Sequence, residues 1–244
     1  MKSESTASCR TGSAEIRFRD GEMEIAADGD SVTIPITPLP ETYLEWFQRG
    51  RSQMYRALVE GERTPGFFAH HLPVIATRGG DTPFTTNLGH KGVGPLPKPE
   101  HLSRYLDHYR ETMEQSRSLE PRERRRVRLE AVQALAEDRE AIDPRCVGTL
   151  EIFRKQTFDN LCSHPFASLL FTGAGPGYMS FQLDCAVEVL DTDDSRYDFL
   201  VLARSMFERE EFHITQPGFA CGYVFWVSEI RDKTPYPMGG GPHR

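Results

Sequence analysis

The chain has 244 residues, a formal net charge of -7 at pH 7 and 38% hydrophobic residues, so it can bury a core as one large or two small domains. The negative charge disfavours a general nucleic-acid binder. Its five cysteines are an odd number without a Cys-x-x-Cys pair, which argues against a disulfide framework or a structural zinc knuckle.

Residues 1–37 are predicted to form an N-terminal β appendage. Apolar and polar residues alternate over Ser13–Pro35, as in half-buried strands. The pairs Asp20-Gly21 and Asp28-Gly29 interrupt this alternation, and such pairs favour tight turns. We therefore expect short strands joined by two turns.

A helix and the first hairpin of a sheet are predicted next. Aromatic and aliphatic residues recur at helical spacing from about Thr42 to Gly61, although Gly50 lowers the helix propensity in the middle. Phe67–Thr77 and Pro83–Leu88 are apolar and β-like, with turn residues between them. We expect these two segments to pair.

A helical insertion of about residues 99–142 is predicted to follow a Gly- and Pro-rich crossing at Gly89–Pro99. The compositions of Leu102–Leu119 and Pro121–Ile142 are those of two helices. Within the second, the basic run Arg122–Arg128 includes Glu123 and is followed by Glu130, Glu137, Asp138 and Glu140. A solvated helix face explains that run better than a polyanion site does.

Four more strands and two helices are predicted beyond Pro144. One helix starts near Thr157 and is ended by Pro165, and another follows Asp194 or Ser195 as its N-cap. The strands are Val147–Phe153, Ala167–Phe171, Met179–Leu190 and Ala220–Ile230.

The start of the helix near Thr157 is a candidate anion site. Lys155 and the Thr157 hydroxyl stand where an extended segment turns into a helix, a place that favours phosphate. The alternative is a solvated helix start with a hydroxyl cap. By contrast, Gly173–Gly177 does not predict a dinucleotide site, because Tyr178 replaces the third glycine and a strand follows.

The histidines do not predict a metal site. His70 and His71 would point to opposite faces of the predicted strand, so they cannot ligate one metal from the same side. Cys162 and His164 are two residues apart in a helical turn and do not face each other, so they are not expected to act as a catalytic pair.

The segment Thr157–Phe171, together with a strand ending in Ala186–Leu190, resembles the pyridoxamine 5'-phosphate oxidase-like, FMN-binding split-barrel proteins. This resemblance implies an α+β fold, with a six-stranded antiparallel split β-barrel, flanking helices and the helical insertion. The barrel domain would span residues 38–235, with a flexible tail at 236–244. The family also implies a homodimer that holds FMN between subunits, with the phosphate on basic and hydroxyl side chains.

Carried over by position, Thr157 and Asn160 match the family's Thr-x-x-Asn-Leu turn, and Pro83–Asn87 resembles the strand along the flavin. The cofactor-binding residues that the resemblance implies are Thr86, Asn87, Lys91, Lys155, Thr157 and Asn160. No catalytic residue is assigned, and His213 and Arg204 are weaker candidates for substrate contact. The vitamin B6 oxidases carry an Arg on that strand and a Ser-Arg-Lys run before the helix, and both are absent here.

The resemblance therefore favours an FMN-dependent oxidoreductase for a small-molecule substrate, different from a typical vitamin B6 oxidase. A non-enzymatic flavin- or heme-binding protein, or an interaction scaffold, is the alternative, and the added N-terminal and helical elements favour it. A metal-dependent enzyme using His70, His90 or His164 is the third hypothesis. With no apolar run near the roughly 20 residues that span a bilayer, we expect a cytoplasmic protein.

Overall fold

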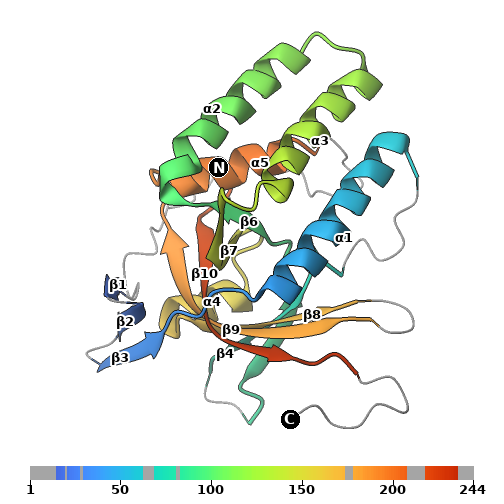
Figure 1. The fold of residues 1–244 in the computed structure, drawn as a ribbon. Coiled ribbons are helices and arrows are strands. Elements are labelled where there is room, and N and C mark those ends of the chain that lie inside the picture. Colours follow the sequence, from blue (N-terminus) through green and yellow to red (C-terminus); the bar gives the residue numbers. More distant parts are fainter. Residues whose placement is uncertain are drawn as a thin grey trace.

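Two antiparallel sheets and five helices build the part of the chain that the computed structural model describes (Figure 1). The described residues are 15–19, 21–27, 30–62, 69–80, 83–173, 178–207 and 218–235. Predictions for residues 1–14, the glycine-rich segment 174–177, His213 and the tail 236–244 fall outside these ranges. The fold is α+β, as expected, with one large sheet at its centre.

The large sheet contains seven strands, and all its neighbouring pairs are antiparallel. Their order across the sheet is β5 (Thr86–His90), β4 (Val74–Arg78), β8 (Phe166–Thr172), β9 (Ser180–Leu190), β10 (Gly222–Asp232), β7 (Ile142–Leu150) and β6 (Gly94–Pro97).

The sequence predicts six strands for this sheet, and the seventh is β6, which lies in the predicted Gly89–Pro99 crossing. The sequence does not predict this strand, because Pro95 and Pro97 are unfavourable within a strand. Both prolines are tolerated because β6 is the last strand in the order and needs hydrogen bonds on one side only.

The smaller sheet contains β1 (Glu15–Arg19), β2 (Glu22–Ala27) and β3 (Asp30–Pro35), so the described N-terminal residues form short strands as predicted. Met23 and Ile25 of β2 are buried in the same hydrophobic cluster as residues of the main sheet. The Phe18 ring meets the Trp226 ring edge-on, with centroids 4.6 Å apart. The small sheet is therefore packed on the main one.

Five helices in the described ranges pack against the large sheet or against one another. They are α1 (Glu41–Glu60), α2 (Pro99–Ser116), α3 (Pro121–Glu137), α4 (Gln156–Ser163) and α5 (Ser195–Ser205). In Figure 1, α2 and α3 lie together beside α5 at one end of the molecule, and α1 runs alongside α3. None of the helices in the described ranges is long and apolar enough to cross a membrane.

Several predicted boundaries differ from the structure. The second inserted helix ends at Glu137 rather than Ile142, because Asp138 turns the chain and accepts a hydrogen bond from the Ala141 N–H at 3.1 Å. The strand predicted to reach Phe153 ends at Leu150. Asp194 is confirmed as the N-cap of α5, since its side chain accepts from the Arg196 N–H at 2.8 Å.

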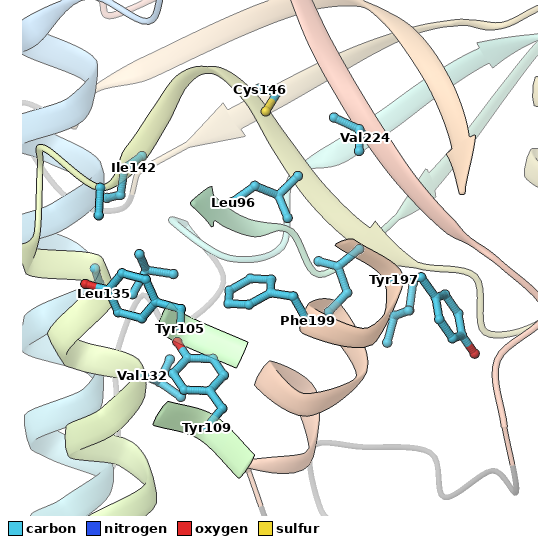
Figure 2. Packing of buried hydrophobic residues seen from close by; sticks show 14 of the residues in the cluster. Leu96, Tyr105, Tyr109, Val132, Leu135, Ile142, Cys146, Tyr197, Phe199 and Val224 are labelled. Carbon is cyan, nitrogen blue, oxygen red and sulfur yellow. The ribbon is translucent and has the colours of Figure 1, made fainter. Parts of the chain in front are cut away.

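Strand β10 separates two hydrophobic clusters. Tyr223, Phe225 and Val227 pack on one face, in a cluster that includes Tyr43 and Phe47 of α1. Val224 and Trp226 pack on the other face, beneath α2, α3 and α5, as Figure 2 shows for part of this cluster. Because side chains alternate along a strand, one strand serves both cores.

Candidate functional site

A hydrogen-bonded side-chain network joins β4, β5 and α4, and three of the six predicted cofactor residues belong to it or anchor it. Asn87 donates through Nδ2 to Thr157 Oγ1 at 3.0 Å and to Thr77 Oγ1 at 3.4 Å. Asn160 Nδ2 donates to the same Thr77 hydroxyl at 3.0 Å. We call this network, with its two strands and helix, the β5–α4 corner.

The corner is tightly packed around Asn160, which is buried. Gln156 Nε2 donates to Asn160 Oδ1 at 2.7 Å. A methyl group added at Gly79 would meet the same oxygen at 2.1 Å, so only glycine fits at that point of the β4–β5 hairpin. Asn160 therefore fixes α4 against the hairpin.

The start of α4 is basic and has no side-chain cap. Lys155 occupies the N-cap position, with its Nζ 5.3 Å from the centre of the Phe153 ring. Arg154 has a φ of 43°, in the left-handed region, and its guanidinium lies 5.6 Å from the centre of the Phe158 ring. The Thr157 hydroxyl bonds to Asn87 instead of capping the helix, so the hydroxyl-cap alternative is not what forms here.

The Glu151 carboxylate stabilises the turn that leads into α4. One carboxylate oxygen accepts the N–H groups of Phe153 and Arg154, at 2.9 and 3.0 Å. The other accepts from Lys91 Nζ at 2.7 Å and from the Tyr223 hydroxyl at 2.8 Å. Such satisfied acceptor sites compensate for the desolvation of a buried charge.

The pKa of Glu151 is below its ordinary value. Burial raises it, and this largest single influence is outweighed by the charge of Lys91 together with the hydrogen bonds from Lys91, Phe153 and Tyr223. Burial also raises the pKa of Tyr223 far above that of a free phenol, so the hydroxyl remains a donor. Lys91 and Glu151 thus form a buried ion pair, with 11% and 3% of their side chains exposed.

The six predicted residues are therefore not equivalent. Asn87, Thr157 and Asn160 hold the corner together, Lys155 stands at the adjacent helix start, and Thr86 is exposed on β5. Lys91 forms an ion pair with Glu151, a residue that was not among the predicted site residues. Its role could have been inferred from its position in the sequence, because Glu151 directly follows the mostly apolar run Cys146–Leu150. A carboxylate buried at the end of such a run needs a cationic partner.

His70 and His71 lie in a turn, so the prediction that they belong to a strand is wrong. His70 packs against Trp46, with ring centres 4.2 Å apart, and His71 Nδ1 lies 3.1 Å from the Val93 carbonyl oxygen. Strand β4 begins only after Pro73, whose missing N–H delays strand pairing. Across the described ranges, no cluster of three or more His, Cys, Asp or Glu side chains is placed to hold a metal ion.

No protein-family model and no curated protein matches the sequence. Solved structures that match include an FMN-binding protein from Syntrophomonas wolfei, with 9% identity over 81% of this chain and 95% of that one and a TM-score of 0.39. A protein from Listeria innocua, provisionally named a pyridoxamine 5'-phosphate oxidase, has 11% identity over 75% and 97%, with a TM-score of 0.38.

A heme-binding protein from Mycobacterium smegmatis matches with 11% identity over 77% of this chain and 57% of that one, with a TM-score of 0.34. The names of these structures include a pyridoxamine 5'-phosphate oxidase and an FMN-binding protein, as in the family that the sequence resembles. Because all these TM-scores are below 0.5, any functional proposal must rest on the residues of the β5–α4 corner.

Proposed function

We propose that the chain binds FMN at the β5–α4 corner and acts as a flavin-dependent oxidoreductase on a small molecule. The observation that carries this proposal is the start of α4, where an uncapped helix N-terminus, the Lys155 ammonium and the Thr157 hydroxyl occur together. Uncapped N–H groups and the helix dipole both favour a phosphate dianion at such a place.

The Thr157 hydroxyl fits a role in holding phosphate. It accepts a hydrogen bond from Asn87, so its own proton is left to donate, and no acceptor for that proton occurs among the described residues. Asn87 fixes the position of the oxygen. Lys155 would add a charge-assisted hydrogen bond, and Arg154, held in its left-handed conformation, adds a second positive charge nearby.

Residues of β5 would orient the flavin. Asn87 is half-exposed on the side of β5 that faces α4, and Thr86 is exposed on the opposite side, because side chains alternate along a strand. Asn87 would bond to the ring edge, and Thr86 would contact only a part of the flavin that passes around the free edge of β5. When bound, the isoalloxazine ring supplies the electron-transfer chemistry. The chain's own contribution is to position the ring and to exclude water from one of its faces.

A second copy of the chain would complete the site. The outward face of β5 and β8 exposes Leu88 and Leu170, with relative exposures of 66% and 37%, and Phe166 beside them on β8. Exposed apolar side chains grouped on one sheet face are typical of an association surface. We place the homodimer contact on this face, which lies around the free edge of β5 from the β5–α4 corner.

The first experiment is an absorption spectrum of the purified full-length chain, followed by titration with FMN and with riboflavin, which lacks the phosphate. A flavin spectrum, or FMN binding at least tenfold tighter than riboflavin binding, is the expected result. A Soret band would support the heme-binding alternative. A colourless protein that binds neither flavin would refute the proposal and favour a scaffold.

A further inference from the structure

A cavity lies between the sheet and the helices, and its lining includes none of Thr77, Asn87, Thr157 and Asn160 of the β5–α4 corner. Its volume is about 190 Å³, and its walls come from α1, α2, α3, α5 and the segment around β6 and β7. Figure 2 shows Tyr109, Val132, Leu135 and Phe199, which line it, meeting between the helices. The helical insertion thus supplies part of the wall.

Arg51 of α1 lines this cavity and is only 2% exposed. Its guanidinium donates to the Tyr55 hydroxyl at 3.0 Å and to the Val93 carbonyl oxygen, and it lies over the Phe47 ring. Within the described part of the chain, the Nε–H has no hydrogen-bond partner and no carboxylate forms an ion pair with Arg51.

This differs from two other cations in the same fold, the largely buried Lys91 and the partly buried Arg196, which both have carboxylate partners. Lys91 meets Glu151, and Arg196 meets Glu188 and Asp194. Burial of a charge without a counter-charge is expensive, and a bound anion would remove that cost. Arg51 is therefore the cation of an incomplete ion pair.

Tyr109 of α2 gives a second, independent sign of a missing ligand. Its side chain lines the cavity and is fully buried, yet its hydroxyl has no hydrogen-bond partner among the residues that the structure describes. Buried hydroxyl groups are nearly always paired, because an unpaired one loses its bonds to water without replacement. An oxygen acceptor inside the cavity would satisfy Tyr109 and Arg51 together.

The other lining residues indicate which kind of ligand would supply this oxygen acceptor. No Asp or Glu is among the lining residues, and the positive charge of Lys91 is already neutralised by Glu151. The Tyr109 and Phe199 rings stack with centres 5.4 Å apart, and aliphatic side chains of α3 and α5 complete an apolar wall. A cavity of about 150 Å³ with such a lining accommodates benzene, so this one has room for one ring and a carboxylate.

We propose that this cavity binds a small aromatic or branched monocarboxylate, whose carboxylate pairs with Arg51 and accepts a hydrogen bond from Tyr109. The apolar body of the ligand would lie between the insertion helices and α5. Arg204, a candidate substrate residue from the sequence, lines the same cavity. This site does not depend on FMN binding.

The test is calorimetric titration of the full-length chain with benzoate and with 3-methylbutanoate, using benzamide as the uncharged match of benzoate. We expect at least one carboxylate to bind and to raise the unfolding temperature, and benzamide to bind at least tenfold more weakly than benzoate. The proposal is overturned if neither carboxylate binds, or if benzamide binds as well as benzoate.

The variant Tyr109→Phe tests the location of the site. It removes only an unpartnered hydroxyl, so the free protein should be at least as stable as the wild type. Affinity for the carboxylate should fall about tenfold, since a hydrogen bond to a charged group is lost. Affinity within a factor of about two of the wild type would overturn the assignment. FMN affinity is measured on the same variant and should not change.

Discussion

The imidazole of His70 occupies the space that a side chain at Gly50 would need. A Cβ atom added at Gly50 would lie 2.2 Å from the His70 ring, and the ring is also packed on Trp46. The glycine in the middle of α1, unfavourable for a helix on its own, is therefore the residue that lets the 69–71 turn pack against the helix.

Gly50→Ala should destabilise the protein, although alanine normally stabilises a helix interior by about 1 kcal/mol relative to glycine. Overpacking against His70 costs about 1 to 3 kcal/mol, which outweighs that gain. In a His70→Ala background the clash is absent, so the same substitution should become stabilising. Urea unfolding of the four proteins gives the coupling free energy, and additive effects would contradict the packing.

Gly94→Ala is the matched control for this cycle. Its added methyl group would meet no atom within 4 Å, and the backbone φ of Gly94 is not positive. Its effect on unfolding should be the same in the wild-type and His70→Ala backgrounds.

His70 should also make stability depend on pH. Burial, and then the nearby charge of Arg51, lower its pKa to about 4 from an ordinary value of 6.5. The unfolded chain binds the proton first, so the stabilisation is complete above about pH 6.5 and is lost progressively as the pH falls toward 4. The profile of unfolding free energy against pH should therefore be flatter in His70→Asn over this window.

The matched control is His108→Asn, which makes the same substitution at an exposed histidine of α2. An identical pH dependence in the wild type and His70→Asn would show that His70 does not remain neutral in the folded protein.

The helices could be predicted well because their signals are local. Tyr43, Phe47 and Leu58 recur at helical spacing, and Asp194 is a strong N-cap next to an apolar stretch. By contrast, β6 could not be predicted, since its hydrogen bonds come from β7, almost 50 residues later in the chain, while its own sequence is Gly-Pro-Leu-Pro.

The network around Thr157 and Asn160 was predicted only in part, because motif resemblance identifies residues but not their partners. Glu151 pairs with Lys91, which is 60 residues away in the sequence. Arg51 donates to the Val93 carbonyl, which is 42 residues away. A sequence signal does exist for Arg51, which falls on the apolar stripe formed by Tyr43, Phe47 and Tyr55. An arginine on such a stripe is expected to be buried and therefore to need a polar partner.

Lys155→Ala should weaken FMN binding about tenfold or more if its ammonium holds the phosphate, since one charge-assisted hydrogen bond is lost. Riboflavin affinity should stay within a factor of about two, because riboflavin has no phosphate. Fluorescence titration with both flavins measures the difference. Lys98→Ala, before α2, is the matched control, and an equal loss for both flavins in Lys155→Ala would contradict a phosphate role.

Leu88→Lys should disrupt the proposed homodimer by placing a charge on the apolar face of β5. Light scattering coupled to size-exclusion chromatography should show a dimer for the wild type and a monomer for this variant. Val32→Lys, on the small sheet, also replaces an exposed apolar residue and should remain dimeric. A monomeric wild type, or a dimeric Leu88→Lys, would rule out this interface.

Lys91→Met should lower the free energy of unfolding by about 3 to 5 kcal/mol, because it leaves the buried Glu151 carboxylate without its cation. Without Lys91, two of the interactions that lower the Glu151 pKa are lost, so this pKa is higher than in the wild type. The loss should therefore shrink as the pH falls and the carboxyl group takes up a proton. Arg126→Ala breaks exposed ion pairs with Glu123 and Glu130, so it should be far milder than Lys91→Met. If Lys91→Met is as mild as Arg126→Ala, or if its loss grows at low pH, then Glu151 does not depend on Lys91 for its buried charge.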